Sequence, residues 1–328
     1  MDTGALVDTF GRVHRDLRIS VTDRCNFRCE YCMPEEGMQW RPRAEILTFE
    51  EILRVARVFV DRFGFESIRL TGGEPTVRAH LPVLVGKLAT LEVDLSMTTN
   101  GASLAGSAAD LAAAGLGRVN VSCDSLRRDR FEELTRRDEL EAVLGGIDAA
   151  VEAGLDPVKV NVVVMRGIND DEIVDFARFG RDRGVTVRFI EFMPLDGDRR
   201  WHRGRVVPRD EILTAIDRAF PLEPVTRGRE PAEQHRYRDG RGRVGVIPSV
   251  TAPFCDSCDR VRLGAEGALR NCLFSLEETD LRAILRGGGG DDDLATAIEG
   301  SVRAKWAGHA IGQVHFVRPA KSMSQIGG

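Results

Sequence analysis

The sequence lacks long apolar runs and lacks a strong excess of either charge. No stretch approaches the roughly 20 apolar residues that a membrane-spanning helix needs. The first twelve residues carry Asp2 and Asp8 and show no apolar core of a secretory signal. The net charge of −5 does not suit a general nucleic-acid binder, which would be broadly basic. We therefore expect a cytoplasmic protein with no membrane and no nucleic-acid partner.

Cysteine is scarce, with only seven in 328 residues. An odd count without an export signal disfavours a disulfide framework. Six of the seven form two triplets, namely Cys25, Cys29 and Cys32, and Cys255, Cys258 and Cys272. Neither triplet has a fourth cysteine nearby, unlike the four-cysteine motifs of bacterial ferredoxins. The seventh, Cys123, lies in a predicted strand without spaced partners, and we interpret it as a small core residue.

The first triplet has the spacing C-x3-C-x2-C and follows an alternating, strand-like run. Three thiolates can hold three irons of a cubane iron–sulfur cluster and leave the fourth iron open. An open coordination position is what separates catalytic from structural metal sites. The alternatives are a zinc site, although a paired C-x2-C and a fourth ligand are missing, and three unrelated buried cysteines. The second alternative is disfavoured because the loop is mostly polar.

The second triplet leaves two interpretations open. A zinc ribbon would need a histidine as fourth ligand, and His235, His309 and His315 are candidates. A second iron–sulfur cluster with one open iron is the interpretation that we favour. Two such clusters that face each other would need a ligand between them.

Six strand-like segments alternate with helical patterns and predict an α/β fold built of βα units. Because parallel crossovers are right-handed, we expect a partial (βα)6 TIM-type barrel. The predicted strands are residues 16–21, 66–70, 93–98, 118–123, 158–165 and 186–193, and the predicted helices begin at Thr48 or cover 80–89, 104–114, 140–153 and 171–183.

The chain divides by pattern into three parts. Residues 1–13 read as a flexible arm, 14–207 as the barrel, and 208–328 as a smaller C-terminal region with the second triplet. Within the last part, we expect a helix over 208–220, a hairpin over 237–247, a flexible charged turn over 287–293 and a helix over about 294–307.

Basic residues occur inside predicted strands, where cations are rarely buried unless they are paired. Arg18, Arg69, Lys159 and Arg188 lie on four separate strands, and Arg260 and Arg262 lie two apart beside the second triplet. Each strand cation could instead lie on the outer face or pair with an acidic neighbour. Six cations that converge suit a highly charged anion such as a triphosphate. Neither a Walker motif nor G-x-G-x-x-G after the first strand is present, so side chains would hold the phosphates.

The C-x3-C-x2-C loop with Tyr31 before its last cysteine resembles the signature of the radical S-adenosylmethionine (SAM) enzymes. Residues 18–34 as a whole closely resemble the GTP 3′,8-cyclases, which catalyse the first step of molybdenum cofactor (molybdopterin) biosynthesis. The resemblance continues through 71–75 (TGGEP), 98–101 (TTNG), 120–124 (NVSCD), 159–161 (KVN), 188–193 (RFIEFM), 255–262 (CDSCDRVR), 272–274 (CLF) and the final Gly-Gly.

The resemblance implies a lyase that converts GTP to (8S)-3′,8-cyclo-7,8-dihydroguanosine 5′-triphosphate with SAM and two 4Fe-4S clusters. A 5′-deoxyadenosyl radical would abstract H3′ of the ribose, and C3′ would join C8 of guanine. The resemblance also implies an electron donor, a downstream cyclic pyranopterin monophosphate synthase and a homodimer.

Each role is carried over to a matching position of this sequence. Cys25, Cys29 and Cys32 resemble ligands of the SAM cluster, and Cys255, Cys258 and Cys272 resemble ligands of the second cluster, whose open iron would meet the guanine. The implied SAM contacts are Tyr31, Gly73, Ser122 and Met193. The implied GTP contacts are Arg18, Arg69, Thr98, Lys159, Arg188, Arg260 and Arg262. Gly327 and Gly328 resemble a tail that enters the active site.

One departure is Ser67, where some relatives carry a basic residue, and it puts one phosphate contact in doubt. Two rivals stand beside this interpretation. A peptide-maturing radical SAM enzyme would usually have more C-terminal cysteines, and its substrate would not call for a cationic barrel. A two-cluster electron carrier would need four protein ligands for each cluster.

Overall fold

The computed structural model describes residues 4–226, 228, 230–311, 313 and 316–327. Its strands form one curved sheet in the order β12-β11-β10-β1-β2-β3-β4-β5-β6-β9-β8-β7. The six expected strands are all present and neighbouring ones pair in parallel, which confirms the partial barrel. Their bounds are β1 Asp16–Ser20, β2 Ser67–Thr71, β3 Asp94–Thr99, β4 Arg118–Ser122, β5 Val158–Val164 and β6 Thr186–Glu191.

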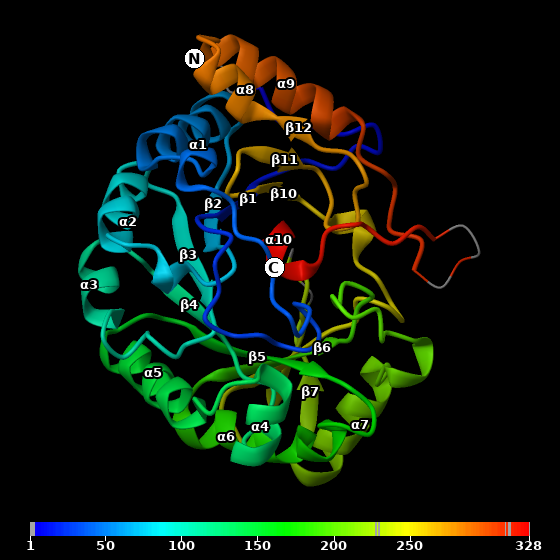
Figure 1. Cartoon of the computed structure of the whole chain (residues 1–328). Coiled ribbons are helices and arrows are strands. Elements are labelled where there is room, and N and C mark those ends of the chain that lie inside the picture. The colour runs from blue at the N-terminus through cyan, green and yellow to red at the C-terminus, as the bar shows by residue number, and fades with distance from the viewer. Residues whose placement is uncertain (1–3, 227, 229, 312, 314–315, 328) are drawn as a thin grey trace.

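Helices cover the outside of the ring, as Figure 1 shows. They are α1 Phe49–Phe63, α2 Leu81–Ala89, α3 Ala108–Ala113, α4 Arg128–Thr135, α5 Leu140–Glu152, α6 Ile173–Arg183, α7 Arg209–Ala219, α8 Leu281–Arg286 and α9 Asp291–Arg303. A further short helix, α10 (Met323–Ile326), lies inside the ring (Figure 1). No helix in the described part of the chain is long and apolar enough to cross a membrane.

Local signals place α1 where the sequence predicts it. Thr48 and Glu51 form a reciprocal capping box at its start, and Gly64 ends it in the left-handed conformation. Its buried side chains include Ile52, Val55 and Phe59, which recur at helical spacing and pack toward the sheet. The helix is therefore fixed at both ends by backbone capping and along its length by burial.

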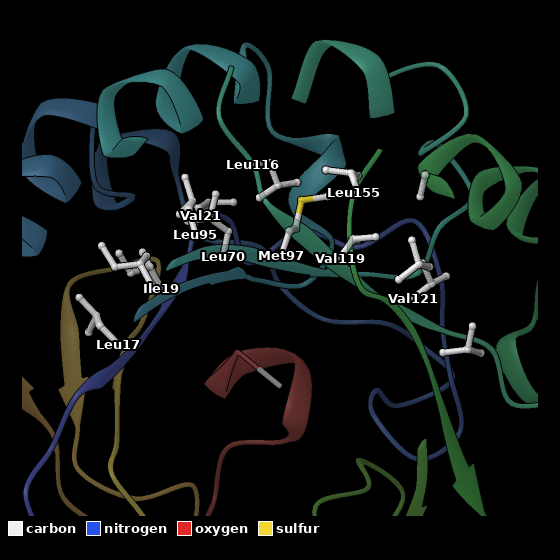
Figure 2. Close-up of a cluster of buried hydrophobic side chains, with 14 of the residues drawn as sticks. Leu17, Ile19, Val21, Leu70, Leu95, Met97, Leu116, Val119, Val121 and Leu155 are labelled. Carbon is white, nitrogen blue, oxygen red and sulfur yellow. The ribbon is translucent and has the colours of Figure 1, made fainter. Parts of the chain in front are cut away.

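The two faces of each barrel strand differ in chemistry, because successive side chains point to opposite faces. The outward face is apolar, and Figure 2 shows its side chains pointing from the sheet toward the helices. Full burial of one such side chain contributes about 1.5–3 kcal/mol. The labelled side chains are Leu17, Ile19, Val21, Leu70, Leu95, Met97, Leu116, Val119, Val121 and Leu155.

The inward face is polar and cationic, so the barrel encloses a hollow and not a second apolar core. Arg18, Arg69 and Ser96 stand side by side on β1, β2 and β3. On β5 and β6, Asn161 stands beside Arg188. These positions alternate with the buried apolar residues of the same strands, such as Leu17 and Ile19 around Arg18.

The C-terminal region extends the barrel sheet at both edges. The expected hairpin is present as β8 (Glu233–Tyr237) and β9 (Arg243–Ile247), with β7 (Leu222–Pro224) beside β8, and β9 pairs in parallel with β6. The chain then crosses to the opposite edge, where β10 (Arg260–Leu263) pairs in parallel with β1. Strands β11 (Ala268–Arg270) and β12 (Thr279–Asp280) follow. The boundary at residue 207 therefore stays a prediction, and the sheet continues across it.

Two segments that we expected to be flexible are at least partly ordered in the described chain. Residues 4–13 of the expected mobile arm are packed, because Leu6 and Asp8 are buried and Val7 pairs with Val13. The expected turn is present over 287–290, whereas residues 291–293 form the first turn of α9. Three acidic residues in the first turn of that helix complement the positive end of its dipole.

Candidate active site

The first triplet lies on the loop that leaves β1. The amides of Cys32 and Met33 both donate to the Cys29 carbonyl, at 2.9 and 3.0 Å, so Cys29 and Cys32 lie on one tight turn. The amides of Arg28 and Glu30 donate to carbonyls at the end of α4, each at 3.0 Å. Because α4 anchors the middle of the loop, the three sulfurs are held toward the hollow. The sequence did not signal α4.

The three cysteines of this loop form no disulfide and are half-buried. Burial raises the pKa of Cys25 to about 11 and that of Cys32 to about 12, and it raises the pKa of Cys29 well above its usual value. The negative charges of the neighbouring cysteines also raise the pKa values of Cys29 and Cys32. The sulfurs are therefore close enough to interact electrostatically. A bound cation reverses this balance and favours the thiolates. The triplet therefore fits a positively charged metal cluster.

The loop after β2 packs tightly on the cysteine loop, and Gly73 makes this possible. A Cβ on Gly73 would lie 2.3 Å from the Arg24 carbonyl oxygen, which no side chain could tolerate. The next residue, Glu74, is buried, and its carboxylate accepts from the Thr99 hydroxyl and the Asn100 amide, both at 2.6 Å. Glu74 thus ties together the ends of β2 and β3 beside the first triplet.

A cavity of about 180 Å³ adjoins the first triplet. Besides Cys25, Cys29 and Cys32, it is lined by all four of the expected SAM contacts, Tyr31, Gly73, Ser122 and Met193. The Tyr31 hydroxyl bonds to the Asp124 carboxylate, and Asp124 also accepts the Val163 amide at 2.7 Å. Burial raises the pKa of Asp124 to about 6, although both hydrogen bonds oppose the rise.

The second triplet lines another cavity, of about 170 Å³. Cys255 and Cys258 lie on a short turn closed by a 3.1 Å bond from the Cys258 amide to the Cys255 carbonyl, and Cys272 follows β11. Of the histidine candidates, His309 lines this cavity, His235 lies on β8 outside it, and His315 is outside the described residues. Among the residues that the structure describes, no three His, Cys, Asp or Glu side chains are placed to hold a single metal ion.

Cys258 lies beside two cations. Burial alone would raise its pKa, but the positive charges of Arg260 and Lys305 lower it to about 6. The Arg260 guanidinium lies 3.6 Å and the Lys305 ammonium 3.7 Å from the Cys258 sulfur. The thiolate, which is the form that binds iron, is therefore favoured at this position near neutral pH.

The six predicted cations converge, as expected. The second cavity is lined by Arg18, Arg69, Arg188, Arg260 and Arg262, together with Thr98. Lys159 lines a third cavity of about 120 Å³, together with four of the same arginines. Arg188 is held in place by the Asn161 and Asn120 amide oxygens, at 2.7 and 2.8 Å.

These cations are costly to bury. Burial and repulsion from neighbouring arginines lower the pKa of Arg18 to about 9. Burial also lowers the pKa values of Arg69 and Arg188 to about 10, and that of Arg262 falls well below its usual value. Asp16 is the carboxylate that faces most of them, at 3.7 Å from the Arg18 guanidinium. A polyanion would relieve this excess of positive charge.

The two triplets face one hollow. The first and second cavities share five lining residues, which are Thr98, Asn161, Ile190, Met193 and Met323. A ligand that fills the second cavity would therefore touch the same side chains as one that fills the first. The expectation that the triplets oppose each other across a cationic space is met by this geometry.

The C-terminal tail enters the hollow, where Figure 1 shows α10 inside the ring. The Ser324 hydroxyl donates to the Cys32 carbonyl at 3.4 Å, and the Arg262 guanidinium donates to the Gly327 carbonyl. Gly327 has a φ of +78°, and a Cβ there would lie 2.9 Å from the Thr71 hydroxyl. Gly328 lies outside the described residues.

Sequence reasoning missed several residues of the site. Asn120 and Asn161 were quoted only as parts of motifs, and no signal marked them as supports for Arg188. Arg118 and Glu230 line the third cavity, where Ser67 also lies. Arg118 was detectable, because it is one more cation inside a predicted strand. Cys123 is buried as expected, and its thiol donates to the Ser125 carbonyl at 3.4 Å.

Comparison with protein families finds two adjoining matches. Residues 19–180 match the radical SAM superfamily, and residues 185–311 match the family described as Molybdenum Cofactor Synthesis C. The second match includes all three cysteines of the second triplet and the segment that crosses from β9 to β10.

Curated relatives match nearly the whole chain. "GTP 3′,8-cyclase 2" of Mycobacterium tuberculosis (strain H37Rv) is 48% identical over 99% of this chain and 93% of its own length. "GTP 3′,8-cyclase" of Streptomyces coelicolor is 49% identical over 98% of this chain and 96% of its own length. "GTP 3′,8-cyclase" of Rhodopirellula baltica is 49% identical over 100% of this chain and 93% of its own length.

Solved structures support the fold. Streptococcus suis SuiB bound to S-adenosylmethionine has a TM-score of 0.61 at 14% identity, over 89% of this chain and 69% of SuiB. Methylornithine synthase (PylB) has a TM-score of 0.51 at 17% identity, over 64% of this chain and 63% of that one.

Proposed function

The chain belongs to the radical SAM superfamily and, within it, to the GTP 3′,8-cyclases, and from this premise we propose how its own residues perform the reaction. It is a lyase that converts GTP to (8S)-3′,8-cyclo-7,8-dihydroguanosine 5′-triphosphate, the first step of molybdenum cofactor biosynthesis. The observation that carries the assignment of roles is the single hollow, with a three-cysteine set at each side and buried cations between them.

Cys25, Cys29 and Cys32 would hold one 4Fe-4S cluster, and Cys255, Cys258 and Cys272 would hold the other. Three thiols for each cubane leave one iron open for a ligand, and both cavities adjoin their triplets. When bound, the first cluster and SAM supply the radical that takes hydrogen from C3′ of the GTP ribose. The protein supplies binding, orientation and exclusion of water.

Binding of SAM would use the first cavity. Tyr31, Gly73, Ser122 and Met193 line it, and the loop that contains Gly73 is fixed by Glu74. Because Gly73 lacks a side chain, this loop can pack on the cysteine loop, and its backbone forms part of the cavity wall. These residues would hold SAM in the first cavity, beside the wall that it shares with the second.

Binding of GTP would use the second and third cavities. The buried arginines would hold the triphosphate, since guanidinium groups bind phosphate oxygens in pairs. Arg18, Arg69, Lys159, Arg188, Arg260 and Arg262 are the contacts that we assign to the phosphates, with Thr98 at the wall shared with the SAM cavity. The guanine would lie toward Cys255, Cys258 and Cys272.

The tail would close the space between the two ligands. Gly327 lies against Thr71 and Ser20 and accepts from Arg262, so the tail reaches from the first triplet to a phosphate-binding arginine. We assign to Gly327 and Gly328 the exclusion of water and the alignment of the reacting carbons. If the reacting carbons were held out of alignment, the rate of cyclisation would fall steeply.

The proposal includes partners. An electron donor must reduce the first cluster, and a cyclic pyranopterin monophosphate synthase must consume the product. We also propose a homodimer and a cytoplasmic location, which suits seven free cysteines because reducing compartments keep thiols reduced.

The test is anaerobic reconstitution followed by turnover with SAM, a reductant and GTP. The expected products are 5′-deoxyadenosine and the cyclised nucleotide in equal amounts, measured by liquid chromatography and mass spectrometry. ATP in place of GTP is the control, and it should give neither product at a comparable rate. Formation of 5′-deoxyadenosine at the same rate without GTP would contradict the proposal.

A further inference from the structure

A lysine, Lys305, is buried beside the second triplet. The Lys305 residue is only 3% exposed. Its ammonium lies 2.8 Å from His14 Nε2, 2.9 Å from the Arg260 carbonyl oxygen and 3.7 Å from the Cys258 sulfur. None of its hydrogen-bond partners in the described chain is a carboxylate. Lysine is almost never buried unless it is paired, so a negative partner is to be expected.

The N-terminal arm holds this lysine in place. His14 is fully buried and lies within hydrogen-bond distance of the ammonium through Nε2. Burial and the charge of Lys305 lower the pKa of His14 to about 4, so the ring is neutral near pH 7 and its Nε2 can accept a hydrogen bond from the ammonium. Asp8 lies 3.8 Å from the same ring nitrogen and forms a 2.5 Å ion pair with Arg12.

Arg12 connects the arm to both chain segments around the cysteines. Its guanidinium donates to the Cys255 carbonyl at 2.8 Å, to the Ala307 carbonyl at 2.7 Å and to the Trp306 carbonyl at 2.6 Å. One side chain thus bridges the loop of the second triplet and the segment that carries Lys305. The placement of Lys305 relative to Cys258 is therefore built by residues about 290 positions apart in the sequence.

We propose that Lys305 is a positioning residue of the second cluster, whose ammonium donates a hydrogen bond to the Cys258 sulfur and makes that cluster easier to reduce. This inference rests on the proposed second cluster. Reduction adds one negative charge to a cluster, and a fixed positive charge beside a ligand sulfur stabilises the reduced form. Hydrogen bonds to the sulfurs and local charge are known determinants of cluster potential.

The same geometry explains why the N-terminal arm is packed. Without His14 and Arg12, the ammonium would be free to turn toward solvent, and its effect on the cluster would be lost. Residues 8–14 thus act on the second cluster through Lys305, although none of them is a ligand.

The test compares Lys305→Met with Lys305→Arg in the full chain with both clusters reconstituted. Iron and sulfide are counted for each chain, and each cluster is followed by electron paramagnetic resonance during a redox titration. Lys87→Met is the control, because Lys87 lies on α2 and pairs with Glu50 on the outside of the barrel.

In Lys305→Met, we expect about a tenfold lower ratio of reduced to oxidised second cluster at a fixed potential, a shift of about 59 mV for one electron. The first cluster should not shift, and Lys305→Arg should stay close to the parent. Loss of the second cluster's iron from Lys305→Met, with retention in Lys305→Arg, would also support the role of the charge.

Two outcomes would overturn the inference. One is an unchanged second-cluster potential in Lys305→Met at full iron content. The other is loss of the second cluster from both variants, which would show that shape and not charge matters at residue 305. If the parent chain itself takes up iron for only one cluster, the proposed function fails, which is a different result.

Discussion

The prediction that best separates binding from folding concerns Arg188, which is 4% exposed on β6 and lines both cationic cavities. We expect Arg188→Met to weaken GTP binding without unfolding the protein. A hydrogen bond to a charged group contributes about 1.5–3 kcal/mol. Loss of one such bond to a phosphate would raise the Kd for GTP about 10- to 100-fold.

The cost of this substitution to stability should be small. Arg188 donates three hydrogen bonds to two amide oxygens, those of Asn120 and Asn161, and with a charged donor each acceptor is worth about 1.5–3 kcal/mol. Against them, burial lowers the pKa of Arg188 from 12.5 to about 10, which corresponds to a cost of about 3 kcal/mol for the charged form. The two contributions offset each other in large part, so the melting temperature of the protein without GTP should fall by less than about 6 °C.

The assay is calorimetric titration of GTP into the cluster-loaded protein, paired with thermal melting without GTP. Arg178→Met is the matched control, because Arg178 lies on the outer surface of α6 and pairs with Asp175. Unchanged GTP affinity in Arg188→Met would refute the assignment of Arg188 to the phosphates. A drop in melting temperature of 10 °C or more would show that the bonds to Asn120 and Asn161 are structural.

Three further predictions follow from single contacts. Glu230 lies 3.1 Å from the Lys159 ammonium and competes with phosphate for it, so Glu230→Gln should lower the KM for GTP a few-fold, as steady-state kinetics would show; a higher KM would contradict this. Gly327→Ala should reduce cyclisation at least tenfold while SAM still binds, because the new Cβ would meet the Thr71 hydroxyl at 2.9 Å; equal product formation in a mass-spectrometric assay would remove the role of the tail. His14 has a folded-state pKa of about 4 against 6.5 when unfolded, so the unfolded chain binds the extra proton and stability falls by about 3 kcal/mol as the pH drops from 6.5 to 4. His14→Gln should flatten that dependence in denaturant unfolding, and an unchanged slope would show that His14 is not its source.

The six central strands and most outer helices were predictable because their apolar residues recur at the period of the element. Leu17 and Ile19 alternate with Arg18 on β1, and that alternation already separates the two faces of the barrel wall. The cysteine spacing and the motifs at the strand ends likewise pointed to the site, since parallel strands place their carboxyl ends at one edge.

Some elements could not be predicted because their cause is non-local. The N-terminal arm is short, and no pattern in residues 4–13 predicts that Arg12 donates hydrogen bonds to the carbonyls of Cys255 and Ala307. Helix α10 has four residues, and its position is set by contacts with Cys32 and Met38, almost 300 residues away. A periodic signal needs more residues than either segment has.

The sequence by itself determined which residue types the site contains, because thiol spacing and strand periodicity are local properties. Strand alternation also predicted that the barrel cations lie on the face opposite the apolar residues. Only the tertiary structure decided that the two triplets share one hollow, since this depends on the crossing of residues 248–259 from one sheet edge to the other. The same is true of Lys305 and His14, because a pairing across such a sequence separation follows from burial in the folded chain and not from any local pattern.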